Sequence, residues 1–343
     1  MTLTAEDLAN GAAAEPLLGD GGAVIRPMLV VDLDQDVANI ESAAEYARRS
    51  DRILVGRATR EVAAELHPLI DALDLTYAPV ASSRAVVDVP DPDVGIAEFT
   101  EAVTRNPQAA LVARQVVRAS ETLPVPEAID VESFGYSTLQ GGPEFAAWLA
   151  ERGPRPLPPP SAEPVLIARD GEFLHITLNR PERRNAYGTV LRDALVDALR
   201  LALLDDSVER VVLDGAGSSF CAGGDLDEFG RTPDTTLAHF VRTRGGAGRL
   251  VAELADRIEV RLHGHCIGAG IEIPAFAGRV VAAPETVFRL PEVSMGLIPG
   301  AGGTVSIPRR IGRWRSLHLF VTAAPLEVSR AFDWGLVDEI RDM

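Results

Sequence analysis

The chain has 343 residues and a net charge of −17, and it is 46% hydrophobic and 24% charged, as is typical of a globular protein. The negative charge disfavours general binding to nucleic acids or anionic membranes, and because all 33 lysine-or-arginine positions are arginine, Schiff-base chemistry and a Gly-Lys phosphate loop are excluded. Only two cysteines are present and no apolar run has the length of a signal peptide or membrane span, so we predict a cytoplasmic location.

The first part of the chain predicts a small α/β module followed by helices. Residues 1–22 are expected to form a flexible tail that contains one helical turn begun by Thr4. Apolar periodicity predicts strands at 26–33, 52–58, 76–80 and 84–89, and helices at 37–49, 60–73, 94–105, 108–120 and 143–152. We interpret Tyr136 and Trp148 as core packing, with a place in a site wall as the alternative. No Gly-x-Gly-x-x-Gly follows the first strand, so dinucleotide binding is not predicted.

A proline-rich segment, PRPLPPPSAEP at 154–164, separates this part from the rest. Proline at this density builds neither helix nor sheet and forms a semi-rigid spacer. We therefore predict a linker at 154–164, an N-terminal α/β and helical domain at 23–153, and a second domain at 165–343.

The second domain alternates strands with helices. Strands are predicted at 165–168, 173–178, 210–213, 258–262, 279–283, 287–290 and 336–340, and helices at 190–204, 249–255, 314–323 and 329–335. The glycine-rich turns at 268–270 and 300–303 each open a helix, where unpaired backbone N–H groups can hold negative charge. Two carboxylates, Glu272 and Glu292, stand nearby in apolar sequence.

Three stretches in this order resemble the crotonase (enoyl-CoA hydratase/isomerase) superfamily: NRPERRNA at 179–186, SSFCAGGDLDEF at 218–229, and residues 263–313. The resemblance covers residues 164–343 and implies an α/β fold built as a spiral of ββα units, with the N-terminal α/β module and helices as an extension. Family members typically continue with helices that cover the acyl pocket and help to build trimers, and from the resemblance we expect the domain at 165–343 to lack these helices. We expect the helical part of the N-terminal region to cover part of the pocket instead.

The resemblance implies an oxyanion hole for a thioester carbonyl, made by the backbone N–H groups of Gly224 and Ala269. The family usually has glycine at the second position, and Ala269 keeps the N–H group. In hydratases of the family, glutamates at the positions of Glu272 and Glu292 hold a water molecule and move its proton, and we expect them to titrate as a coupled pair. The alternative is structural: two tight turns, with Glu272 capping or salt-bridged in the core and Glu292 starting a turn.

The same resemblance implies contacts to coenzyme A. Arginines near the hairpin end would lie beside its phosphates, with a solvated basic turn as the alternative: Arg180, Arg183 and Arg184. Residues of the second motif would cradle its adenine: Ala222, Asp225 and Leu226. No metal is predicted, because no three or four ligands converge around the neighbouring His263, His265 and Cys266. We expect no further cofactor, since coenzyme A enters as part of the acyl-CoA thioester, and we expect a homo-oligomer, a trimer or hexamer.

The predicted function is hydration of a 2-enoyl-CoA, or the reverse dehydration. One alternative keeps the oxyanion hole for isomerisation, decarboxylation or cofactor-free oxygenation. Another is a non-catalytic protein that binds a CoA thioester or serves as a scaffold.

Overall fold

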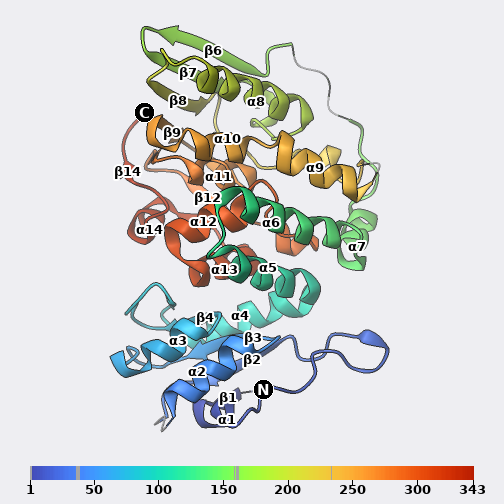
Figure 1. Ribbon diagram of the computed structural model, residues 1–343, viewed down its shortest axis with the longest axis vertical. Helices are drawn as coiled ribbons and strands as arrows, with labels where there is room; N and C mark the ends of the chain where they lie inside the picture. The colour runs from blue at the N-terminus through green and yellow to red at the C-terminus, as the bar shows by residue number, and fades with distance from the viewer. Residues whose placement is uncertain (1, 36–38, 158, 160–161, 233) are drawn as a thin grey trace.

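The computed structural model describes residues 2–35, 39–157, 159, 162–232 and 234–343, and it places a sheet toward each end of an elongated molecule (Figure 1). The sheet nearer the N-terminus is five-stranded and parallel, in the order β1-β2-β3-β4-β5. Its strands are β1 (Thr2–Thr4), β2 (Met28–Asp32), β3 (Ile53–Arg57), β4 (Leu75–Ala78) and β5 (Val86–Asp88). Three short helices connect them: α1 (Ala5–Ala9), α2 (Ile40–Arg49) and α3 (His67–Ala72).

The central strands β3 and β4 are buried on both faces, which explains why they are mostly apolar runs without alternation. Along β3, Leu54 belongs to a small cluster with side chains of α1 to α3, whereas its neighbours Ile53 and Val55 belong to the main core. Successive side chains of a strand point to opposite faces, so the sheet joins two hydrophobic cores.

Residues 2–9, at the start of the segment that we expected to be a flexible tail, pack on this sheet, whereas Leu18 of the same segment is 55% exposed. Strand β1 pairs in parallel with β2, and Leu3 and Leu8 are almost fully buried. The helical turn expected at Thr4 is confirmed as α1, where Thr4 and Asp7 form a capping box. The helix predicted at 37–49 begins at Ile40, and residues 36–38 lie outside the described residues.

Four longer helices follow: α4 (Pro92–Arg105), α5 (Pro107–Ser120), α6 (Val125–Gln140) and α7 (Pro143–Arg152). Sequence reasoning missed α6, as it missed α9 (Thr235–Gly245) later in the chain. Both helices contain glycine, serine or threonine, which lower helix propensity, and they pack against each other. Their stability therefore comes from tertiary contacts that a local pattern does not show.

The C-terminal half contains a six-stranded sheet in the order β14-β11-β9-β8-β7-β6, parallel except for the β6–β7 hairpin. Its strands are β6 (Val165–Asp170), β7 (Phe173–Leu178), β8 (Arg210–Gly215), β9 (Ile258–Leu262), β11 (Arg279–Ala282) and β14 (Glu339–Ile340). A three-stranded sheet stands beside it: β10 (His265–Ile267), β12 (Val287–Arg289) and β13 (Leu326–Glu327). The remaining helices are α8 (Thr189–Leu204), α10 (Ala247–Glu253), α11 (Ala269–Glu272), α12 (Gly303–Ile311), α13 (Arg313–Thr322) and α14 (Val328–Trp334). The predicted α/β class is confirmed.

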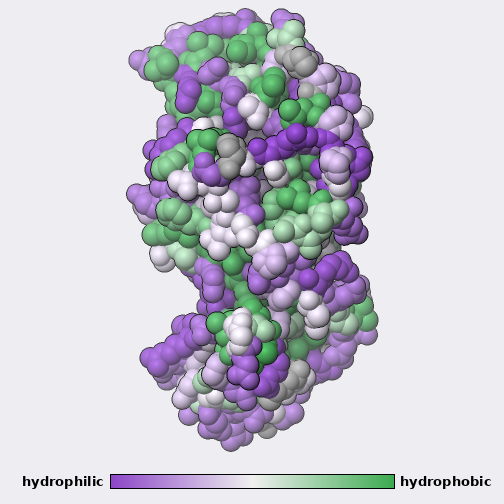
Figure 2. All heavy atoms as spheres, turned by 90° about the vertical axis from the view of Figure 1, so that its right-hand side faces the viewer, coloured by the Kyte–Doolittle hydropathy of each residue, from purple (hydrophilic) through white to green (hydrophobic). Residues whose placement is uncertain are grey.

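The main core continues across the proline-rich segment. Phe99 and Ile129 from the N-terminal helices are buried in the same cluster as Ile298 and Phe320 from the C-terminal half. Figure 2 shows a smaller lobe, which contains the five-stranded sheet, joined to the larger part through a narrower waist. The domain limits at 154–164 stay a prediction, and residues 158, 160 and 161 lie outside the described residues.

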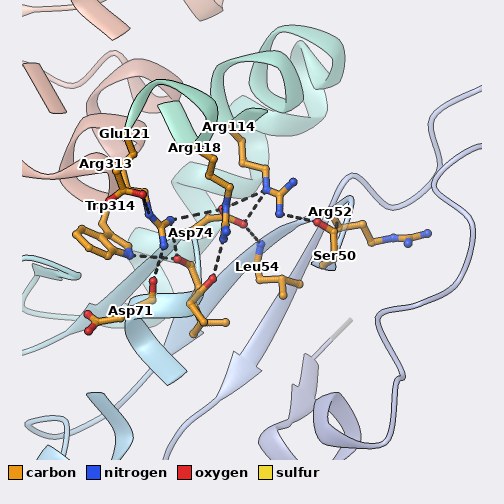
Figure 3. Close-up of polar contacts among 12 residues, drawn as sticks. Ser50, Arg52, Leu54, Asp71, Asp74, Arg114, Arg118, Glu121, Arg313 and Trp314 are labelled. Carbon is orange, nitrogen blue, oxygen red and sulfur yellow. Dashed lines mark hydrogen bonds and ion pairs between the residues drawn. The ribbon is translucent and has the colours of Figure 1, made fainter. Parts of the chain in front are cut away.

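A buried ion cluster ties the five-stranded sheet to α5 and α13 (Figure 3). The Asp74 carboxylate, 1% exposed, accepts hydrogen bonds from Nε of Arg118 at 2.7 Å and Nε of Arg114 at 3.1 Å. It also accepts the backbone N–H of Leu54 at 2.8 Å, and the guanidinium of Arg313 lies 3.9 Å away. One carboxylate therefore faces three arginines from two helices at the junction of the lobes.

Candidate active site

Two loops from separate motifs run side by side at the site. Cys221 and Cys266 form a parallel β-bridge, in which the Ile267 N–H donates to the Cys221 carbonyl at 3.0 Å. A Cβ atom at Gly270 would lie 2.3 Å from that same carbonyl oxygen, so the close approach of the loops requires glycine there. This pairing places residue 224 on one loop near residue 269 on the other.

The predicted oxyanion-hole residues, Gly224 and Ala269, both line one cavity of about 670 Å³. Among the described residues, neither backbone N–H donates to a protein acceptor. Ala269 is the first residue of α11 and does not have a positive φ, so alanine fits there without backbone strain. Two unpaired N–H groups thus border the same space, as an oxyanion hole requires.

The two predicted glutamates border this cavity as well. Glu272 is the last residue of α11 and 2% exposed, and its Oε2 accepts the N–H groups of Ala301 at 2.7 Å and Gly303 at 3.0 Å. Glu292 opens the short helix Glu292–Met295 and is 8% exposed, and its Oε2 has no partner among the described residues. One carboxylate is therefore held by main-chain donors, and the other keeps a free oxygen.

Both carboxylates converge on the turn at Gly268. A Cβ atom there would lie 2.4 Å from Oε1 of Glu292 and 3.6 Å from Oε1 of Glu272. Both Oε1 atoms therefore lie beside the same turn of the chain.

Replacing Gly268 with alanine is expected to lower activity strongly while leaving the core intact. The added methyl would collide with the Glu292 carboxylate, and φ of +49° also disfavours a side chain at this position. Displacing a reacting group by about 1 Å can cost on the order of 100-fold in rate. Steady-state kinetics would check this, with Gly245→Ala as the control because its Cβ would meet open space. Equal kcat values in the two variants would contradict the expectation.

The sequence analysis missed one residue of the site, Glu132. It belongs to α6, which runs beside α9 and α12 (Figure 1), and it is 1% exposed and lines the cavity. Tyr136 of α6 and Phe145 of α7 line it too, which confirms that N-terminal helices cover part of the pocket. Tyr136 and Trp148 both pack against the main core, as we interpreted them, and Tyr136 also borders the cavity. Trp148 packs on Phe145 with ring centroids 5.9 Å apart. No local signal marks Glu132, because its partners lie about 170 residues away along the chain.

The three buried carboxyl groups hold their protons more tightly than exposed glutamates. Burial raises the pKa of Glu132 to about 7 and that of Glu292 to about 8. Burial also raises the pKa of Glu272 well above its ordinary value, and the negative charges of Glu292 and Glu132 add to this effect. Near neutral pH, the site can therefore present both a protonated and an ionised carboxyl group.

These shifts predict that unfolding becomes easier as pH rises. In the folded protein the pKa values of Glu132 and Glu292 lie above the ordinary 4.5. Their protonated forms therefore contribute fully to stability below pH 4.5, and this contribution is lost as the pH rises through about 7 and 8. Urea unfolding at a series of pH values would measure the free energy of unfolding. Glu132→Gln is expected to flatten the decline, whereas the exposed Glu127→Gln on the same helix is not. An identical slope in Glu132→Gln and the wild type would contradict the assignment.

The residues predicted to contact coenzyme A lie in different surroundings. Arg180 is 1% exposed and lines the cavity, with its Nη2 donating to the Pro159 carbonyl at 3.3 Å. Arg183 is bound to two carboxylates, Asp225 at 2.7 Å and Asp227 at 2.8 Å, and only Arg184 of the three is exposed.

The three residues predicted to cradle adenine also differ in whether they reach the cavity. Asp225 borders the cavity but is occupied by Arg183, whereas Ala222 and Leu226 lie outside the cavity wall. The structure thus brings Arg180 and Asp225 to the cavity and leaves Arg184 at the surface. Within the described ranges, no helix is long and apolar enough to cross a membrane.

Comparisons with known proteins agree on the C-terminal half. Residues 169–342 match the family described as enoyl-CoA hydratase/isomerase. The chain is 33% identical over 172 residues to 1,2-epoxyphenylacetyl-CoA isomerase of Escherichia coli K12, covering 49% of this chain and 65% of that protein. It is 32% identical over 176 residues to 2,3-dehydroadipyl-CoA hydratase of the same strain, covering 51% and 68%. A solved carnitinyl-CoA dehydratase from Mycobacterium avium 104 is 36% identical, covering 53% of this chain and 71% of that chain, with a TM-score of 0.47.

Proposed function

Because the chain belongs to the enoyl-CoA hydratase/isomerase family, we propose that it adds water across the double bond of a 2-enoyl-CoA, or removes water in the reverse direction. One observation carries the proposal: two unpaired backbone N–H groups and two converging buried glutamates border the same cavity. The first pair suits a carbonyl that gains negative charge, and the second suits the movement of protons.

The thioester carbonyl oxygen would accept hydrogen bonds from the N–H groups of Gly224 and Ala269. Addition at the β-carbon moves negative charge onto this oxygen as an enolate forms, and the donors then bind more strongly than they bind the ground state. A single donor of this kind is typically worth about 100- to 1000-fold in kcat. Both donors are main-chain groups, so their place depends on the paired loops rather than on side-chain identity.

The glutamates would then divide the proton transfers. An ionised carboxylate takes a proton from water as its oxygen attacks the β-carbon, and a protonated carboxyl delivers a proton to the α-carbon. Carboxyl groups whose pKa values lie near or above neutral can supply both forms at once, as a coupled pair. The fixed position of Glu272 and the two Oε1 atoms beside Gly268 suit a shared water between the glutamates.

The coenzyme A part of the substrate would lie along the outer cavity. Arg180 borders it and the exposed Arg184 lies four residues later, so of the three arginines predicted to contact phosphate these two remain candidates. Arg183 positions Asp225 and Asp227 instead. Assembly as a trimer or hexamer, and a cytoplasmic location, stay predictions.

Assays with purified protein and two acyl-CoA thioesters test the proposal. We expect crotonyl-CoA to be converted to a 3-hydroxyacyl-CoA, followed by mass spectrometry as the gain of one water. A 3-enoyl-CoA converted to the 2-enoyl isomer without gain of water would support isomerisation. Tight binding of both thioesters without turnover would support a non-catalytic CoA-binding protein and overturn the proposal.

Isomerisation of the double bond is the second candidate. It is favoured by the unequal state of the glutamates, since Glu292 has a free oxygen while Oε2 of Glu272 is tied to two N–H groups. A single mobile carboxyl group is sufficient to carry a proton between two carbons. Glu292→Gln would then abolish isomerisation, whereas Glu272→Gln would reduce it less.

A further inference from the structure

Four consecutive main-chain N–H groups at the start of α12 are shared between two glutamates. The N–H groups of Ala301 and Gly303 donate to Oε2 of Glu272 at 2.7 and 3.0 Å. Those of Gly302 and Thr304 donate to Glu132 at 2.8 Å each, one to Oε1 and one to Oε2. The donors alternate along the chain, so the loop is held from two sides.

The hydroxyl of Thr304 completes the ring of donors around Glu132, at 2.7 Å from its Oε2. Both oxygens of Glu132 are therefore occupied, and the side chain is 1% exposed. The unpaired N–H groups at a helix start carry partial positive charge, which explains why two carboxylates are tolerated there. With both oxygens committed, Glu132 is placed to fix the loop rather than to touch a substrate.

Glu272 depends on this loop for its own position. Among the residues that the structure describes, only the N–H groups of 301 and 303 hold its Oε2, and they alternate with the two that Glu132 holds. A shift of the loop would therefore move the Glu272 carboxylate away from the point where it meets Glu292.

We propose that Glu132, supplied by α6 from outside the family match, is a positioning residue of the active site, which clamps the 301–304 loop and thereby aims Glu272. The inference rests on the proposed function of Glu272 in proton transfer. It makes the N-terminal helices part of the catalytic centre, in addition to their role as a cover.

The charges that face Glu132 come from three elements packed around it. Glu272 of α11 and Glu292 of the short helix Glu292–Met295 are the negative neighbours, and the charge of Glu132 raises the pKa of both. Arg242 of α9 is the positive neighbour and lowers the pKa of Glu132. The Arg242 guanidinium lies 4.4 Å from the ring centroid of Tyr136, on α6 itself, and its Nε donates to Ser133. Removing the Glu132 charge should therefore lower the pKa of both catalytic carboxyl groups.

The experiment compares Glu132→Gln with Glu132→Asp in the full-length protein. Glutamine keeps the size but loses the charge and one acceptor oxygen, so we expect kcat to fall by about 100-fold, with KM changed far less. The ascending limb of the kcat–pH profile, set by ionisation of the base, should move to lower pH. Aspartate keeps the charge but is shorter, so kcat should fall while that limb stays at its wild-type position. Glu127→Gln, exposed on the same helix, is the control and should match the wild type.

Thr304→Val provides a second variant that retains every charge. It removes only the hydroxyl donor to Glu132, so we expect a loss in kcat smaller than that of Glu132→Gln, with the pH limb unmoved. This variant keeps the inference testable if Glu132→Gln fails to fold.

A readout without turnover separates this inference from the proposed function. Carboxyl ¹³C NMR of glutamate-labelled protein, assigned with Glu272→Gln and Glu292→Gln, follows the titration of both groups directly. We expect both to titrate at lower pH in Glu132→Gln. If that shift appears while no enoyl-CoA is hydrated, the electrostatic and positional role of Glu132 stands and the proposed function fails. Unchanged titrations together with wild-type kcat and pH profile in Glu132→Gln would overturn the inference.

Discussion

Replacing Glu272 with glutamine is expected to lower kcat for hydration of a 2-enoyl-CoA by about 10²–10⁴-fold. Glutamine keeps the side-chain length and one oxygen that can accept the N–H groups of Ala301 and Gly303, so the loop should hold its place. The amide cannot release or accept a proton near neutral pH, so the reaction loses one of its two acid/base groups. Glu292→Gln should produce a loss of similar size.

Binding and stability should be preserved in these variants. The oxyanion-hole donors are main-chain groups of other residues, so the Kd for a CoA thioester, measured by calorimetry, should stay close to that of the wild type. Removing one of several crowded carboxylates should leave the protein as stable as before, or more so, at pH values above about 8. Glu285→Gln is a matched control, since this exposed glutamate lies between the two in sequence. Hydration at wild-type rates by both active-site variants would refute the acid and base assignment.

Replacing Asp74 with alanine is expected to destabilise the protein by about 3–5 kcal/mol, the usual cost of leaving buried charges without a partner. Arg114 and Arg118 would lose the carboxylate that they share, and the N–H of Leu54 on β3 would lose its acceptor (Figure 3). Burial already disfavours the charged form of the third guanidinium, that of Arg313, and lowers its pKa to about 10. Urea unfolding at constant pH would measure the loss.

Two further variants sharpen this test. Asp74→Asn keeps the acceptor for the Leu54 N–H but not the charge, so its free energy of unfolding should lie between those of Asp74→Ala and the wild type. Asp71→Asn, three residues earlier, alters an exposed side chain and should change the free energy of unfolding little. Because Asp74 joins the sheet to α5 and α13, its loss should also let the smaller lobe unfold before the rest. A single transition at wild-type urea concentration would show that the cluster contributes little.

Much of the fold could be predicted from local pattern. Strands β2 to β5 and the helices on either side of the proline-rich segment follow from runs of apolar residues and from their spacing, which are properties of short windows. The failures have the same origin. Leu3 and Leu8 look like isolated apolar residues of a tail, and only pairing of β1 with β2 buries them. Helix α6 has weak local propensity and gains its stability from packing against α5 and α9.

The residues of the candidate site likewise fall into those that the sequence predicted and those that only the folded chain reveals. The residues Gly224, Ala269, Glu272 and Glu292 could be named from the sequence because three motifs resemble those of the crotonase superfamily, and because the two carboxylates stand in apolar surroundings. That Arg183 is occupied by Asp225 and Asp227, some 40 residues away, could not be seen, and it removes this arginine from the candidates for phosphate contact.

The sequence by itself therefore determined the order of the elements, the chemical groups available for catalysis and the two loops that carry them. Only the tertiary structure decided that Glu132 meets Gly302, 170 residues later, and that Tyr136 borders the cavity as well as the core. The physical reason is that helix and strand patterns arise from neighbours along the chain, whereas a buried carboxylate is stabilised by whichever donors folding brings to it. Nothing in the residues around Glu132 specifies those donors, because they belong to a loop on the far side of the proline-rich segment.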